Sequence, residues 1–109
     1  MAESIVIVSA ARTPIAGLLG DFSSLAAWEL GAVAIQAAVA RAGVPGDAID
    51  EVLMGNCLMA GQGQAPARQA MRRAGLPDST GAVTLSKMCG SGMRAMMFAN
   101  DMLDRKSVV

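Results

Sequence analysis

The sequence predicts an α/β fold built from βαβαβα units with a mostly parallel sheet. Short apolar runs at 4–11, 51–58 and 82–88 alternate with segments of helical periodicity, and glycine or proline marks their ends. The composition is 53% hydrophobic and 17% charged, which is typical of elements buried on more than one face. Alternating strands and helices favour parallel strands joined by right-handed crossovers. We expect residues 1–109 to form one domain without a linker.

The first predicted strand is the run SIVIVSAA at 4–11. It is β-branched and almost continuously apolar, as expected of a central parallel strand covered on both faces. Pro14 disfavours a helical conformation at Thr13 and ends the run. Arg12 and Thr13 are interpreted as polar closure of the strand end.

The first predicted helix covers residues 25–42, which are mostly good helix formers. Ser23 or Ser24 stands where a cap is needed at its start, and Gly43 stands where a left-handed residue commonly ends a helix. Apolar residues recur at helical spacing, so one face is expected to pack on a sheet.

A second strand is predicted at 51–58, followed by a glycine-bearing loop and a helix that begins near Pro66 and ends before Gly75. The loop is interpreted as a tight turn, because its GxG spacing departs from a dinucleotide fingerprint at Pro66. The arginines of the helix are predicted to face solvent: Arg68, Arg72 and Arg73. For Arg68 an interface position is an equal alternative.

The third strand is predicted at 82–88 and the last helix at 92–103. Apolar residues cover most of the circumference of this helix, which predicts a helix buried between two layers. The nine methionines of the chain are predicted to pack in the core, since methionine fills irregular gaps there.

The charge balance excludes some classes of partner. Nine basic residues match nine acidic residues, so no excess positive charge attracts a nucleic acid or an anionic membrane. The apolar run near the start has no basic leader and is too short for a membrane span. The sequence therefore predicts a cytoplasmic protein.

Two cysteines and no histidine limit the possible chemistry. Two thiols alone cannot complete a structural zinc site, so we expect no metal. Cys89 stands just before a predicted helix, where the helix N-terminus favours the thiolate, and it is the candidate nucleophile. Gly90 and Gly92 would let a substrate approach and offer backbone N–H groups to an oxyanion. The alternative for Cys89 is a small buried apolar side chain, and that is the preferred interpretation of Cys57.

Three motifs together resemble the thiolase family, and within it the bacterial acetyl-CoA acetyltransferases. They are IVIVSAARTPIAG near the start, GQGQAPARQA at 61–70 and KMCGSGMRA at 87–95. The resemblance implies part of the first half of the thiolase fold, in which related halves stack in five αβαβα layers.

The resemblance also implies a mechanism. Cys89 would attack an acyl-CoA thioester and hold the acyl group, and a second, deprotonated acetyl-CoA would then take it up to give a 3-ketoacyl-CoA. Thiolysis is the reverse reaction. Coenzyme A thioesters are the substrates, and no cofactor or metal is implied.

The chain also departs from the family pattern. A whole thiolase is several times longer, and its catalytic histidines and second catalytic cysteine lie downstream of the part matched here. We therefore expect a truncated chain that is inactive alone and self-associates through the exposed apolar edge of the strand at 4–11. One alternative is a non-catalytic remnant that binds a full-length thiolase. A small thiol redox protein is disfavoured, because the chain has no CxxC pair.

Overall fold

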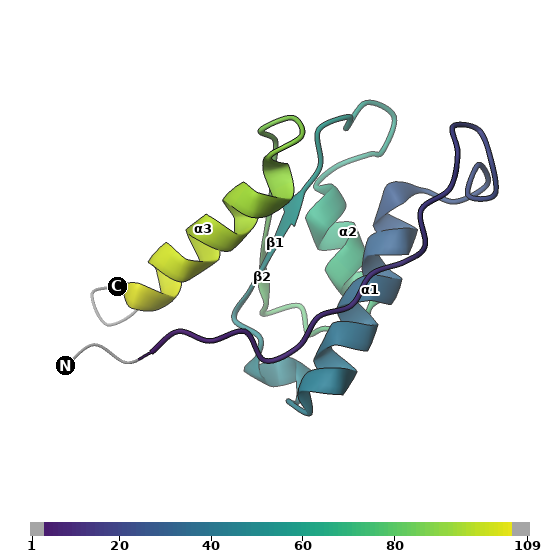
Figure 1. Ribbon diagram of the computed structural model, residues 1–109. Helices are drawn as coiled ribbons and strands as arrows, with labels where there is room; N and C mark the ends of the chain where they lie inside the picture. Colours follow the sequence, from purple (N-terminus) through teal and green to yellow (C-terminus); the bar gives the residue numbers. More distant parts are fainter. Residues whose placement is uncertain (1–3, 106–109) are drawn as a thin grey trace.

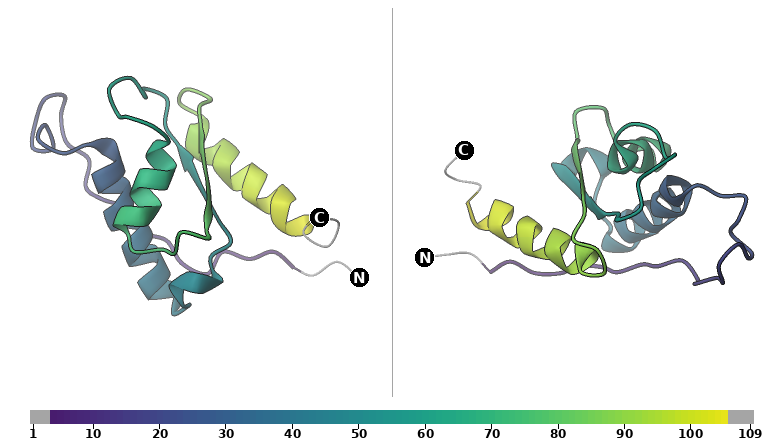
Figure 2. Two further views of the ribbon diagram at one scale, coloured as in Figure 1. Left: turned by 180° about the vertical axis from the view of Figure 1, so that it is seen from behind. Right: turned by 90° about the horizontal axis from the view of Figure 1, so that it is seen from above.

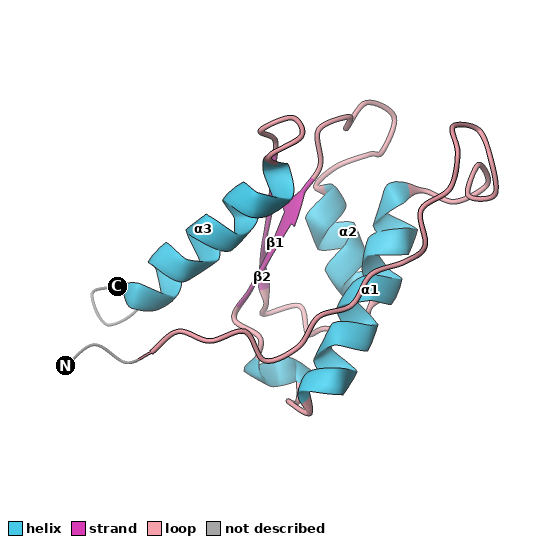
Figure 3. Cartoon of the chain, viewed as in Figure 1, coloured by secondary structure: helices cyan, strands magenta, loops and turns pink. Residues whose placement is uncertain are grey.

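The computed structural model describes residues 4–105, which form a small parallel sheet with helices on both faces (Figures 1 and 2). Helices α1 and α2 cover one face of the sheet, and α3 lies on the other. The elements, drawn by type in Figure 3, are α1 Ala27–Ala42, η1 Gly46–Ala48, β1 Glu51–Gly55, α2 Pro66–Arg73, β2 Gly81–Leu85 and α3 Ser91–Asp104. The predicted α/β class with a parallel sheet is confirmed.

The sheet pairs β1 with β2 in parallel, from Glu51 opposite Gly81 to Gly55 opposite Leu85. The pairing extends one residue further, because the Asn56 N–H donates to the Leu85 carbonyl over 2.9 Å. Both strands are shorter than the runs that predict them. The residues beyond them form the loops at the carboxyl edge of the sheet.

The ends of α1 follow one sequence signal and contradict another. Gly43 ends the helix in the left-handed conformation, with φ 69°, as predicted. The N-cap is Ala26 instead of Ser23 or Ser24. The Ala26 N–H donates to the Glu29 carboxylate over 2.7 Å, so a side chain inside the first turn replaces the serine cap.

The core lies between the sheet and the pair α1 and α2. Met71 of α2 is fully buried and packs with Val52 of β1 and Leu76. A Cβ at Gly31 of α1 would lie 3.3 Å from the Ala70 Cβ. The two helices therefore pack closely because small residues line their contact.

The strand predicted at 4–11 does not form. The segment crosses α1 in an extended conformation (Figure 1), and the described residues contain a sheet of two strands only. Its polar contacts go to α1: the Ser9 hydroxyl donates to the Ala38 carbonyl over 2.6 Å, and Arg41 donates to the Ala10 carbonyl over 2.9 Å. A strand requires a backbone partner, and here side chains and a helix carbonyl take that place. Its apolar side chains are exposed: Ile5, Val6, Ile7 and Val8.

The residues that follow this segment also depart from the prediction. Arg12 donates to the Thr13 carbonyl over 3.2 Å, and Thr13 donates to the Pro14 carbonyl over 3.1 Å. Because no strand ends here, these bonds are local contacts between neighbouring residues and close no strand.

Helix α3 has one covered face and one exposed face. Ser91 and Ala95 are buried. The outward apolar side chains are exposed: Met93, Met96, Met97, Phe98, Met102 and Leu103. The predicted burial between two layers is therefore wrong for the described residues, because the sheet covers α3 on one side only. The predicted core position of the methionines holds for Met71 and for the partly buried Met54, which packs against the core. It is wrong for the exposed Met59 and Met88 and for the methionines of α3, and Met1 lies outside the described residues.

Candidate active site

Cys89 lies in the loop between β2 and α3, directly before Gly90, the N-cap residue of α3. Its side chain is exposed. This loop stands at the carboxyl edge of the parallel strands (Figure 1), where α/β sheets commonly place their sites. The predicted position ahead of a helix is confirmed, and the alternative of a buried apolar filler is not.

A tight turn presents Cys89. The Gly90 N–H donates to the Lys87 carbonyl over 2.9 Å, which closes a turn around Met88 and Cys89. Met88 has φ 45°, a left-handed backbone conformation that residues with a Cβ rarely adopt. The Ser91 hydroxyl donates to the Met88 carbonyl over 2.7 Å and accepts from the Lys87 N–H over 2.8 Å.

The two glycines after Cys89 differ in what they offer a substrate. The N–H of Gly90 is engaged with Lys87. Within residues 4–105, the N–H groups of Gly92 and Met93 have no acceptor, as is usual in the first turn of a helix. A Cβ at Gly92 would meet nothing within 4 Å, so the space beside it is open. These two amides are therefore free to bind an oxyanion, and Gly90, which has no side chain, leaves the surface near the thiol uncrowded.

Cys57 does not occupy the core position predicted for it. It follows the end of β1 and is exposed. The strand ends at Gly55, so Cys57 belongs to the loop at the carboxyl edge of the sheet and lies outside the paired part of β1. The chain therefore carries two exposed thiols, and only Cys89 directly precedes a helix.

The glycine-rich loop after β1 is a set of turns joined by hydrogen bonds of amide side chains. This agrees with its prediction as a tight turn. Gly61 and Gly63 have φ 79° and 80°. The side chain of Asn56 donates to that of Gln62 over 2.7 Å, and Gln69 donates to the Gln62 carbonyl over 2.8 Å. Sequence reasoning did not single out Asn56, although a polar residue directly after a strand is a usable signal for a site at this edge.

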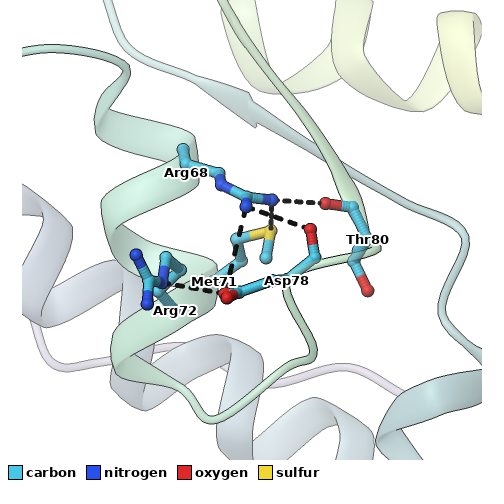
Figure 4. A network of polar contacts seen from close by, with 5 residues as sticks. All are labelled: Arg68, Met71, Arg72, Asp78 and Thr80. Atoms are coloured by element: carbon cyan, nitrogen blue, oxygen red, sulfur yellow. Dashed lines mark hydrogen bonds and ion pairs between the residues drawn. The ribbon is translucent and has the colours of Figure 1, made fainter.

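The arginines of α2 do not all face solvent (Figure 4). Arg68 donates to the Thr80 carbonyl over 2.7 Å and to the Asp78 carbonyl over 3.0 Å. Arg72 forms an ion pair with the Asp78 carboxylate at 3.0 Å. The prediction of a solvated arginine face holds for Arg72 and Arg73, which are exposed, and is wrong for Arg68, which is partly buried. Arg68 fixes α2 to the segment that leads into β2.

Residues 4–105 show neither a metal-binding cluster nor a membrane-spanning helix. No three His, Cys, Asp or Glu side chains there are grouped as they would be to hold a metal ion. In the same part of the chain, no helix combines the length and the apolar character needed to cross a bilayer.

Comparison with known proteins agrees with this geometry. The family model described as "Thiolase, N-terminal domain" matches residues 5–108. The mitochondrial acetyl-CoA acetyltransferase of Xenopus tropicalis is 58% identical over 97 residues, which are 89% of this chain and 23% of that protein. The human mitochondrial acetyl-CoA acetyltransferase is 52% identical over 101 residues, 93% of this chain and 24% of the relative.

Solved structures show the same likeness. The Acat5 thiolase of Ascaris suum, solved in complex with coenzyme A, superposes with a TM-score of 0.87 at 40% identity over 89% of this chain and 25% of its own. The acetyl-CoA acetyltransferase of Syntrophomonas wolfei gives a TM-score of 0.87 at 41% identity, over 94% of this chain and 26% of its own. The chain thus spans about a quarter of the length of the proteins that it matches.

Proposed function

The chain belongs to the thiolase family through its match to the N-terminal domain, and on that premise we propose that Cys89 is the nucleophile of an acetyl-CoA C-acetyltransferase. The observation that carries the proposal is an exposed thiol in the turn directly ahead of α3, a helix whose first turn has two N–H groups without acceptors. The names of the relatives support acetyl-CoA as the substrate.

The chemistry proposed for residues 1–109 is the first half of the reaction. The Cys89 thiol gives up its proton to water, its sulfur attacks the thioester carbonyl carbon of acetyl-CoA, and a new carbon–sulfur bond forms. The oxygen gains negative charge, which the free N–H groups of Gly92 and Met93 would stabilise. The bond to the coenzyme A sulfur then breaks, coenzyme A leaves as its thiolate and takes up a proton, and Cys89 keeps the acetyl group.

The second half of the reaction requires a base that these residues do not supply. A second acetyl-CoA must lose a methyl proton before its carbon attacks acetyl-Cys89, and histidine is the commonest base for such a step. The 109 residues contain no histidine. We therefore propose that residues 1–109 alone do not catalyse the complete reaction, and that the base comes from outside them. The reaction needs no cofactor beyond the coenzyme A thioesters.

Acetyl transfer tests the proposal. The 109-residue chain is incubated with acetyl-CoA, and intact mass followed by peptide mapping locates any acetyl group. We expect the adduct on Cys89, none in the Cys89→Ser variant, and an undiminished adduct in the Cys57→Ser variant. Acetylation of Cys57 ahead of Cys89, or no thioester adduct together with equal alkylation of the two thiols, contradicts the proposal.

A second candidate function has its own observation in its favour. The outward face of α3 and the segment 5–8 expose apolar side chains that a soluble monomer usually covers. We propose as the alternative that the chain binds a full-length thiolase, or a copy of itself, through this surface. Capture of a purified thiolase by the Cys89→Ala variant, without acetylation of the wild-type chain, would favour this alternative.

The cytoplasmic location also stays a proposal. It is supported by the sequence, in which no apolar run is long enough to span a membrane, whereas the relatives from Xenopus tropicalis and human are named as mitochondrial.

A further inference from the structure

Ser91 is buried although the residues that precede it are exposed. Its exposed fraction is 6%, whereas residues 86–89 are all exposed. Serine is usually a surface residue, and a buried hydroxyl needs partners for both its proton and its lone pairs. Here the hydroxyl donates to the Met88 carbonyl and accepts from the Lys87 N–H. One side chain thus bridges two consecutive residues, and these are the two residues just before Cys89.

The bridged segment needs this support because its backbone is strained. Met88 has φ 45°, a conformation that costs about 1–2 kcal/mol in a residue with a Cβ. Such a conformation persists where the surrounding contacts impose it. The Lys87 N–H and the Met88 carbonyl flank the strained φ, and the Ser91 hydroxyl holds both.

Ser91 itself is fixed from the side of the sheet. A Cβ at Gly55, the last residue of β1, would lie 2.7 Å from the Ser91 carbonyl carbon and 2.8 Å from the Gly92 nitrogen. The backbone at the start of α3 therefore lies directly against β1. The hydroxyl of Ser91 transmits this fixed position to the turn that carries Cys89.

We propose that Ser91 is a positioning residue for Cys89. Its hydroxyl holds Met88 in the left-handed conformation, and this keeps the thiol at the opening of α3. Without the hydroxyl, Met88 relaxes and the thiol samples positions away from the free N–H groups. The inference rests on the proposed role of Cys89, and its test is arranged so that the two can fail separately.

The test is the rate of alkylation by iodoacetamide at neutral pH, measured for each cysteine by peptide mapping of the 109-residue chain. Cys57 is an internal reference, because it is exposed and the hydrogen bonds of the Ser91 hydroxyl go to Lys87 and Met88. Thiol reactivity is higher at a helix N-terminus, so we expect Ser91→Ala, which frees the thiol from that position, to slow Cys89 by about 3- to 10-fold. Cys57 should change by less than about twofold, because the variant leaves its surroundings intact.

The matched control is Ser86→Ala, which removes an exposed hydroxyl from the same loop. It should leave both rates unchanged. A Cys89 rate unchanged by Ser91→Ala overturns the inference, and so does an equal change at both cysteines, which would indicate general loosening. A wild-type Cys89 no faster than Cys57 counts against the proposed nucleophile, whereas the role of Ser91 is judged by the change at Cys89.

A double substitution tests the mechanism through Met88. Glycine adopts positive φ without strain, so Met88→Gly should reduce the dependence of the turn on the Ser91 hydroxyl. The loss caused by Ser91→Ala should then be smaller in the Met88→Gly background than in the wild type. An equal loss in both backgrounds would overturn the action of Ser91 through Met88.

Discussion

Gly55 packs against the backbone at the start of α3, to which Gly92 belongs, and the two glycines have different surroundings. A Cβ at Gly55 would overlap the backbone of Ser91 and Gly92, whereas a Cβ at Gly92 would meet open space. Neither glycine has a positive φ. The absence of a side chain therefore serves packing at Gly55, and at Gly92 it keeps the surface near Cys89 clear.

Gly92→Ala should separate stability from activity. Alanine inside a helix is more favourable than glycine by about 0.5–1 kcal/mol, so urea unfolding should show a stabilised chain. The added methyl group would narrow the approach to the free N–H groups. We therefore expect acetylation of Cys89 to slow by about tenfold, because at least one hydrogen bond to the oxyanion is weakened. Faster or unchanged acetylation would contradict a substrate position beside Gly92.

Gly55→Ala should destabilise the fold. The new methyl group would force β1 and the start of α3 apart, which costs about 1–3 kcal/mol in a packed interior. Gly17→Ala is the control, because a Cβ there meets nothing within 4 Å and the residue has no positive φ. Equal midpoints of urea unfolding for the two variants would show that the contact at Gly55 relaxes freely.

At the scale of elements, α2 depends on its arginine contacts with the segment before β2. The Arg68 guanidinium holds two carbonyls at once, a geometry that the single ammonium of lysine cannot reproduce. Arg68→Lys should therefore lower the free energy of unfolding by about 1–2 kcal/mol. Arg73→Lys, at an exposed position of the same helix, should change it by less than about 0.5 kcal/mol. A smaller loss of unfolding free energy for Arg68→Lys than for Arg73→Lys would contradict this role of Arg68.

The elements that could be predicted are those with local signals. Gly43 and Pro66 mark helix ends by their own backbone preferences, and these boundaries agree with the structure. The strand at 4–11 could not be settled in this way, because β-branched residues favour an extended backbone but a strand also requires a neighbour. The extended conformation is present and the pairing is absent.

In the candidate site, too, the residues with local sequence signals could be predicted and those that depend on the fold could not. Cys89 could be found because a thiol, two glycines and a helix start are adjacent in the sequence. Ser91 could not, since its role depends on burial and on the fit against Gly55. Exposure of Cys57 was also missed, because the point at which β1 leaves the sheet is set by its partner strand and has no residue signal of its own.

At the scale of the whole molecule, apolar side chains on the outside of α3 favour association. Met93 and Met97 lie one turn apart on that helix, with exposed fractions of 68% and 49%. We expect the wild-type chain to elute as oligomers in chromatography with light scattering, and the double variant Met93→Lys, Met97→Lys to shift toward monomer. Leu18→Lys with Leu19→Lys adds the same charge in an exposed loop and should shift the elution less. A stable wild-type monomer would contradict the prediction.

The thioether groups of α3 give this surface a chemical label. Hydrogen peroxide converts accessible methionine to its sulfoxide, while a shielded sulfur reacts slowly. Met71, with no exposed surface, is a built-in resistant reference, and Met88 in the loop is an accessible one. If another polypeptide covers α3, the sulfurs of Met93, Met96 and Met97 become resistant while Met88 stays reactive. The oxidation pattern, read peptide by peptide, would therefore map which side of the molecule is occupied in a cell extract.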